Sequence, residues 1–293
     1  MKRTFSILPL LFAIIVVSCT HETPQEPSMI VEAYIDANGY PTVLLHKSYV
    51  LDNIPDSVQT LEEIAEQQLI MWGKVTISDG ENEVILTGRL DTLYLPPYTY
   101  STLNMVGEVG KTYTLTATYK QMTATATTTI PPIATFDSIR VFSNEGNKHI
   151  LAYVSNPPTT EPAYYAMFMR YKGDKQYLLC PFGVFDNSKM HNDLLEVMVY
   201  NPFGNDTNLE YDFDKADTAH IYQLKLARLD YESYRYWNDY VSMATTKGIF
   251  FVPIYENLHG NVSGGIGNFT GMGSTIYNLS ITNNKTYIYC NTN

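Results

Sequence analysis

The sequence predicts a mainly β protein. An N-terminal β-sandwich, of the immunoglobulin-like or carboxypeptidase-regulatory-like type, is followed by a second β-rich domain carrying one aromatic-faced helix. Residues 113–127 alternate between apolar and polar side chains, which is typical of strands with one buried face. Turn signals such as Asn38-Gly39 and Asp79-Gly80 separate short strand-like runs. Short strands with frequent turns favour a sandwich.

The first domain is expected to span residues 29–130. Its predicted strands cover residues 30–36, 42–50, 74–78, 84–87, 113–120 and 122–127. One segment departs from this pattern, because Val58, Leu61 and Leu69 recur at helical spacing with glutamates opposite them. We therefore expect a helical insertion near residues 57–71.

The second domain is expected to span residues 131–293, because Pro131-Pro132 ends the alternating pattern. Its predicted strands cover residues 149–154, 163–171, 176–180, 194–200, 220–229, 249–252, 276–281 and 286–290. Proline and glycine are absent from residues 230–244, where aromatic side chains follow helical spacing. This pattern predicts a helix whose aromatic face packs on a sheet, with carbohydrate stacking as the alternative role of the rings.

The N-terminus has the arrangement of a signal peptide, with two basic residues before an apolar run over residues 5–17. A transmembrane helix needs roughly 20 apolar residues, so this run is too short to be one. It ends at Ser18-Cys19, where a small residue precedes a cysteine as in a bacterial lipobox. We expect residues 1–18 to be removed and Cys19 to carry diacylglycerol and a further acyl chain such as palmitate. Residues 19–28 are expected to form a flexible tether.

The chain is acidic, with 30 Asp and Glu against 19 Lys and Arg and a formal net charge of −11. Basic residues do not cluster along the sequence. Nucleic acids and anionic membrane surfaces are bound by such clusters. We therefore expect no nucleic-acid partner, and attachment to a membrane through the lipid.

The sequence shows no motif for catalysis, metal binding or a cofactor. Its six histidines do not occur at HxH or HxxxH spacing, and it contains no Gly-x-Ser-x-Gly elbow. Residues 264–267 lack the lysine and the following helix of a phosphate loop, so a tight loop or bulge near a sheet edge is expected there. Cys180 and Cys290 could form a disulfide or remain buried thiols. We predict a protein that is not an enzyme and holds no cofactor or metal.

Eight short segments occur in a specific order and spacing through most of the chain. They are Met29–Asp36, Lys74–Gly80, Gly110–Leu115, Ile130–Ile133, Phe136–Ile139, Pro162–Tyr165, Tyr234–Trp237 and Gly260–Phe269. Together they resemble the Bacteroidetes lipoproteins grouped as domain of unknown function 4249. The predicted helix near residues 57–71 departs from that pattern and is interpreted as an insertion.

The resemblance implies an outer-membrane lipoprotein, at the cell surface or on the periplasmic face, that is commonly encoded beside a TonB-dependent transporter. It implies no established activity. The leading hypothesis is therefore a non-enzymatic ligand-binding or accessory subunit of a TonB-dependent outer-membrane transporter. The alternatives are a structural or adhesive cell-surface protein, and a surface hydrolase whose carboxylates converge only in the fold.

Candidate residues for binding a ligand or partner come from two segments, the aromatic helix and the glycine-rich residues 260–273. They are Tyr231, Tyr234, Trp237, Gly264, Gly265, Asn268 and Phe269. An interface there should present aromatic side chains and few charges at its centre.

Overall fold

The computed structural model describes residues 27–48, 68–144, 147–155, 161–189, 194–203, 221–247, 258–281 and 286–291. Strands dominate this part of the chain, which confirms the prediction of a mainly β protein. The predicted signal peptide, Cys19, most of the tether, most of the helix near residues 57–71 and the strand at 249–252 lie outside the described residues. The predicted aromatic helix is present as α3 (Tyr231–Lys247).

The described strands form three sheets. The largest has the order β12-β11-β14-β16-β1-β2-β6-β5, with β17 beside β16. Its strands are β1 (Met29–Asp36), β2 (Thr42–Lys47), β5 (Thr87–Leu90), β6 (Tyr98–Ser101), β11 (Tyr164–Tyr171), β12 (Leu178–Asp186), β14 (Ile221–Leu229), β16 (Ile266–Ile281) and β17 (Thr286–Asn291). This nine-stranded sheet runs through both halves of the chain.

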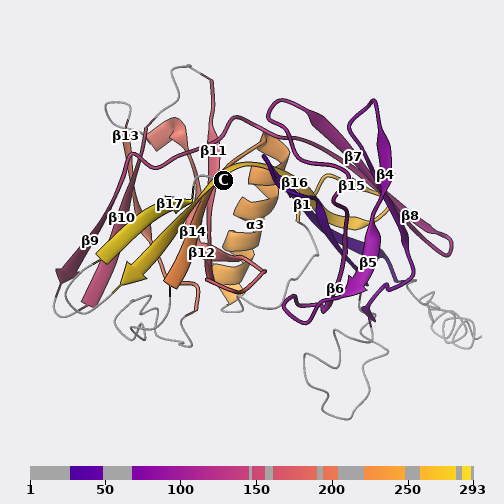
Figure 1. The fold of residues 1–293 in the computed structure, drawn as a ribbon, viewed down its shortest axis with the longest axis horizontal. Coiled ribbons are helices and arrows are strands. Elements are labelled where there is room, and N and C mark those ends of the chain that lie inside the picture. Colours follow the sequence, from indigo (N-terminus) through magenta and orange to yellow (C-terminus); the bar gives the residue numbers. More distant parts are fainter. Residues whose placement is uncertain are drawn as a thin grey trace, which may run out of the picture.

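The two smaller sheets each belong mainly to one half of the chain. The five-stranded sheet has the order β15-β8-β7-β3-β4 and the three-stranded sheet the order β13-β10-β9. Their strands are β3 (Lys74–Ser78), β4 (Glu83–Ile85), β7 (Thr112–Tyr119), β8 (Met122–Thr129), β15 (Val262–Ser263), β9 (Ser138–Asn144), β10 (Asn147–Ser155) and β13 (Leu194–Val199). Figure 1 shows the two sheets on opposite sides of the molecule, with α3 between them.

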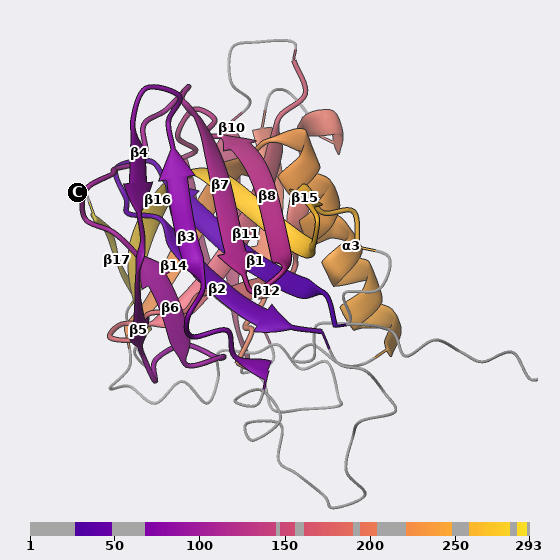
Figure 2. The same cartoon turned by 90° about the vertical axis from the view of Figure 1, so that its right-hand side faces the viewer.

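Both smaller sheets pack on the same face of the nine-stranded sheet. Side chains two residues apart on a strand share a face, and on β16 the odd-numbered Phe269 enters one core while Tyr277 and Leu279 enter the other. The even-numbered Met272 points to the opposite face and packs in a third cluster with Trp237 of α3. Figure 2 shows α3 standing to one side of the strands. The architecture is thus two sandwiches side by side, with a helix on the outer face of the sheet they share.

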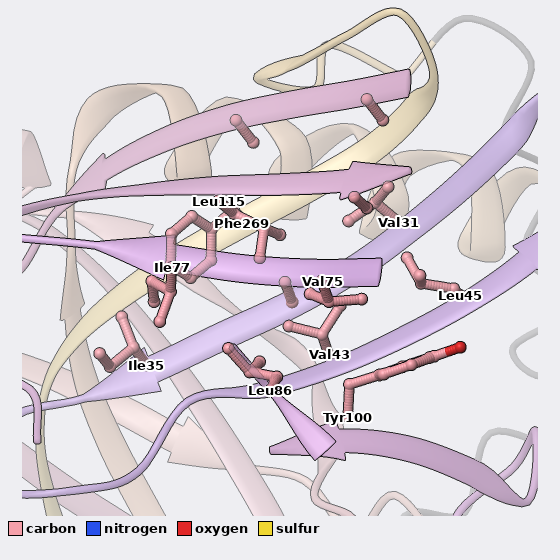
Figure 3. Close-up of a cluster of buried hydrophobic side chains, with 14 of the residues drawn as sticks. Val31, Ile35, Val43, Leu45, Val75, Ile77, Leu86, Tyr100, Leu115 and Phe269 are labelled. Atoms are coloured by element: carbon pink, nitrogen blue, oxygen red, sulfur yellow. The ribbon is translucent and has the colours of Figure 1, made fainter. Parts of the chain in front are cut away.

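Phe269 belongs to the core of the first sandwich although it lies in the C-terminal half of the sequence. It is fully buried together with apolar side chains of β1, β2, β3 and β7. Figure 3 shows it among side chains such as Ile77 and Leu115, which point toward it from the five-stranded sheet. Its position follows from the parallel pairing of β1 with β16, in which Ala33 lies opposite Phe269.

The first half of β16 corrects the prediction of a glycine-rich loop. The tight turn at Gly264 and Gly265 is present, but β16 already begins at Ile266. Glycines allow this strand to lie very close to other backbone: a Cβ on Gly267 would be 2.0 Å from the Val31 carbonyl oxygen. A Cβ on Gly273 would be 2.3 Å from the carbonyl oxygens of residues 131 and 132. The glycines therefore permit close strand packing here.

The aromatic helix begins with a side-chain cap on its first turn. The Ser233 backbone N–H donates to Asp230 Oδ1 at 2.8 Å, the arrangement of an N-cap. The other carboxylate oxygen of Asp230 accepts a hydrogen bond from the Thr128 hydroxyl at 2.9 Å. Asp230 therefore starts α3 and also fixes its first turn to the end of β8.

Candidate functional site

Three tyrosines meet at the first turns of α3 and form an aromatic cluster. The Tyr164 ring of β11 stacks on Tyr234 with 4.7 Å between ring centroids and lies 5.3 Å from the Tyr231 ring. Tyr231 is the outermost of the three, with 52% of its surface exposed. We call these residues, with Asp186 at their edge, the tyrosine cluster.

Asp186 fixes the orientation of the cluster. The Tyr234 hydroxyl donates to Asp186 Oδ2 at 3.0 Å, and the Ser188 backbone N–H donates to Asp186 Oδ1 at 2.8 Å. Burial, followed by the neighbouring Asp186 carboxylate, raises the pKa of Tyr234 to about 12. Tyr234 is therefore a neutral hydrogen-bond donor at physiological pH.

Charged side chains of both signs border the cluster. The Arg235 guanidinium lies 5.7 Å from the Tyr231 ring centroid and 3.4 Å from a Glu232 carboxylate oxygen. Aromatic side chains and arginine are enriched at protein interfaces. This arrangement is suited to non-covalent binding of a ligand or protein.

Trp237 lies one turn further along α3 and attaches the helix to the sheet. Its ring meets Phe168 edge-on at 5.2 Å, and its indole N–H donates to the Thr270 hydroxyl at 3.3 Å. The predicted packing of the aromatic face on a sheet is therefore correct for this residue. The helix presents Tyr231 outward and Trp237 inward.

The glycine-rich segment does not join the tyrosine cluster. Asn268 and Phe269 are buried, so the prediction that they contribute to an exposed binding surface is wrong. The Asn268 side-chain amide instead donates to the Thr270 hydroxyl at 2.7 Å. The turn at Gly264 lies beside Thr123 at the start of β8, whereas the first turn of α3 is attached to the end of that strand.

A second group of polar side chains, which the sequence analysis missed, is buried on the α3 face of the nine-stranded sheet. Lys225 of β14 is only 2% exposed, and its ammonium lies 2.8 Å from Asp36 Oδ2 of β1. The Ser274 hydroxyl of β16 donates to Asp36 Oδ1 at 2.6 Å. The Tyr34 and Tyr177 rings lie 5.8 and 5.0 Å from the ammonium. We call this group the lysine cluster.

Two loops from different halves of the chain meet beside the lysine cluster. Lys175, between β11 and β12, lies 2.6 Å from Asp91, which follows β5. Gln176 accepts a hydrogen bond from the Leu95 backbone N–H at 2.9 Å. The Tyr34 and Tyr94 hydroxyls are 3.2 Å apart. The lysine cluster is thus enclosed by contacts between distant parts of the sequence. The one local indication of it in the sequence is Lys225, a charged residue within the apolar run of β14.

The comparisons with known proteins assign the chain to a family. The family model described as Domain of unknown function (DUF4249) matches residues 18–277. The chain belongs to this family. A comparison with curated proteins found no match. The predicted membership of this family of unknown function is confirmed, and no activity follows from it.

Two further features of this DUF4249 family member bear on the predictions. Cys180 is a buried free thiol, which is one of the two states predicted for it, and burial raises its pKa. Among the residues that the structure describes, no helix has the length and apolar character to cross a membrane. Those residues also contain no group of three or more His, Cys, Asp or Glu arranged to hold a metal ion.

Proposed function

We propose that this chain is an outer-membrane lipoprotein of a Bacteroidetes bacterium, anchored through Cys19, that serves as a non-enzymatic ligand-binding or accessory subunit of a TonB-dependent transporter. The lipobox-like Ser18-Cys19 supports the anchor. The family resemblance supports the transporter as partner. The observation that carries a binding role is the partly exposed tyrosine cluster, which is held in place by Asp186 and bordered by Arg235.

The geometry of the cluster suits recognition of a protein surface. Tyrosine gives a large contact area with few rotatable bonds, so little conformational entropy is lost on binding. Tyr234 is already oriented by its hydrogen bond to Asp186, and Tyr164 is held on β11. Preorganised rings of this kind are expected to act as the central anchors of an interface.

The test is extraction of tagged protein from its own outer membrane in mild detergent, followed by mass spectrometry of what co-purifies. We expect one barrel transporter at near-stoichiometric yield. In the Tyr231→Ala variant the recovered transporter should fall about tenfold or more, because loss of an interface anchor costs more than 1.4 kcal/mol. Tyr40→Ala is the matched control, because Tyr40 is similarly exposed (48% against 52%) but lies at the turn between β1 and β2.

The outcomes distinguish the accessory role of the protein from the position of its interface with the transporter. A wild-type protein that co-purifies with no transporter would count against an accessory subunit and favour an adhesive or structural role. A transporter retained equally by Tyr231→Ala and Tyr40→Ala would preserve the accessory role and remove the tyrosine cluster as its interface.

A further inference from the structure

We infer that one end of the first sandwich lies against the lipid bilayer, with the exposed Trp72 at its centre. We call this end the tryptophan pole. The inference deepens the proposed function and rests on its lipid anchor at Cys19. It assigns a membrane-facing surface that the lipid alone does not define.

The tryptophan pole is built where several strands start or end together. Met29, the first residue of β1, pairs with Lys47, the last residue of β2. Lys74, the first residue of β3, pairs with Thr118 near the end of β7. The Ile70 backbone N–H donates to the Leu45 carbonyl at 3.1 Å and brings the segment before β3 to the end of β2. In Figure 2 the arrow of β3 points upward, so the tryptophan pole lies on the lower side of that view.

Trp72 is displayed at this pole by a rigid support. It is 84% exposed, and the adjacent Met71 is 42% exposed. The buried Tyr100 hydroxyl donates to the Ile70 carbonyl at 2.6 Å and accepts the Gly73 backbone N–H at 2.9 Å. The backbone on both sides of Trp72 is therefore fixed while its indole points outward. Tryptophan is the side chain most characteristic of membrane interfaces, together with tyrosine.

The position of the N-terminus brings this pole to the membrane. The described chain begins at Pro27, and the Ser28 and Ser48 backbones are joined by a hydrogen bond of 2.8 Å. Pro27 follows Cys19 by eight positions, so the two residues are at most about 27 Å apart at full extension. A lipid on Cys19 therefore holds Pro27, which belongs to the tryptophan pole, within that distance of the bilayer.

The described segments at the pole contain basic side chains and no acidic ones. The described segments that form it, residues 27–30, 45–48, 68–74 and 118–124, contain three lysines and no aspartate or glutamate. The whole chain carries a net charge of −11. Lys47, Lys74 and Lys120 are far apart in sequence, and the fold brings them to one end of the sandwich. Basic residues beside an aromatic side chain match the anionic head groups of a lipid surface.

The test uses tryptophan fluorescence, because the chain contains only two tryptophans. The lipidated protein with Trp237→Phe, in which Trp72 is the remaining tryptophan, is reconstituted into phosphatidylethanolamine and phosphatidylglycerol vesicles doped with a brominated lipid. We expect a blue shift and a loss of emission relative to vesicles without bromine. The control carries Trp72→Phe, Trp237→Phe and Leu103→Trp, because Leu103 is 75% exposed near the opposite end of β2. Its emission should be unchanged by bromine.

Flotation of the same vesicles separates the inference from the anchor. Protein that floats with the vesicles while Trp72 is not quenched would overturn the inference, leave the anchor intact and point to a protein partner for the pole. Equal quenching of the Trp72 and Leu103→Trp proteins would also overturn it, because no preferred orientation would exist. Protein purified from the membrane without lipid on Cys19, and unable to float, would overturn the anchor itself.

Discussion

On one face of the nine-stranded sheet, Val31, Ala33 and Ile35 of β1 enter a core of hydrophobic side chains that includes no charged group. On the opposite face, Glu32 and Asp36 of the same strand lie beside α3 and the lysine cluster. The first face follows the alternation of a half-buried strand. The second face buries ionisable groups, and a buried charge lowers the stability of the fold unless it is paired. The contrast indicates that the inner face supplies most of the stability of the fold. The outer face carries ionisable groups, whose contribution to the stability of the protein depends on their ion-pair partners and on pH.

The inner face should give the largest effect on stability. Phe269→Ala removes a fully buried ring from the core that unites β1, β2, β3 and β7. We expect the free energy of unfolding to fall by about 3–5 kcal/mol, because the cavity cannot close between two sheets. Chemical denaturation measures this loss. Leu103→Ala, at an exposed position, should change stability by less than about 0.5 kcal/mol, and a comparable loss in both variants would contradict the assignment of Phe269 to the core.

The lysine cluster is expected to give the next largest effect. Asp36→Asn leaves the buried ammonium of Lys225 without its carboxylate, so stability should fall by about 3 kcal/mol. The double variant Asp36→Asn with Lys225→Met removes the charge as well. It should recover more than half of that loss in a double-mutant cycle. Additive losses would show that the two side chains do not stabilise each other.

Glu32 makes the outer face sensitive to pH. Burial raises the pKa of Glu32 from 4.5 to about 7, beside Tyr236 and Tyr240 of α3. Between these two pH values the folded protein holds a proton that the unfolded chain has lost, so stability falls as pH rises through this window. Above pH 7 the cost is about 3 kcal/mol. Glu32→Gln should flatten the dependence of unfolding free energy on pH between 5 and 8. An unchanged slope would exclude Glu32 as its source.

The difference between the faces also explains what the sequence could predict. The alternation over residues 113–127 identifies β7 and β8 correctly, because one face of each strand meets apolar partners and the other meets solvent. The first part of β16 is missed, since its Gly, Thr and Asn residues show no apolar alternation. These residues are buried by neighbouring strands on one side and α3 on the other.

The candidate site also has a part that the sequence could predict and a part that it could not. Tyr231 and Tyr234 are close in sequence and follow helical spacing, so their common helix could be predicted. Tyr164 and Asp186 complete the cluster from β11 and β12, and nothing local in the sequence links them to α3. Lys225 interrupts an apolar run, which indicates a buried charge, but its partner Asp36 lies 189 residues away in the sequence. Local patterns predict elements, whereas long-range pairing depends on strand order.

The smallest expected effect lies at the edge of the outer face, where Lys175 meets Asp91. The hydrogen bond from Lys175 is the main cause of the lowered pKa of Asp91. A lowered carboxyl pKa stabilises the folded protein at neutral pH, and this contribution is lost as pH falls through the folded-state pKa. Because the Lys175 side chain is 43% exposed, Lys175→Met should lower the free energy of unfolding by at most about 1 kcal/mol.

Denaturation of wild type and Lys175→Met at low and high salt, and at pH 7 and pH 3, measures the contribution of the pair to stability. The cost should shrink in high salt, because screening weakens the pair. It should also shrink at pH 3, because the contribution of the ionised Asp91 begins to be lost once the pH is below its unfolded-state pKa. A cost independent of both conditions would mean that Lys175 contributes through packing of its stem and not through its charge.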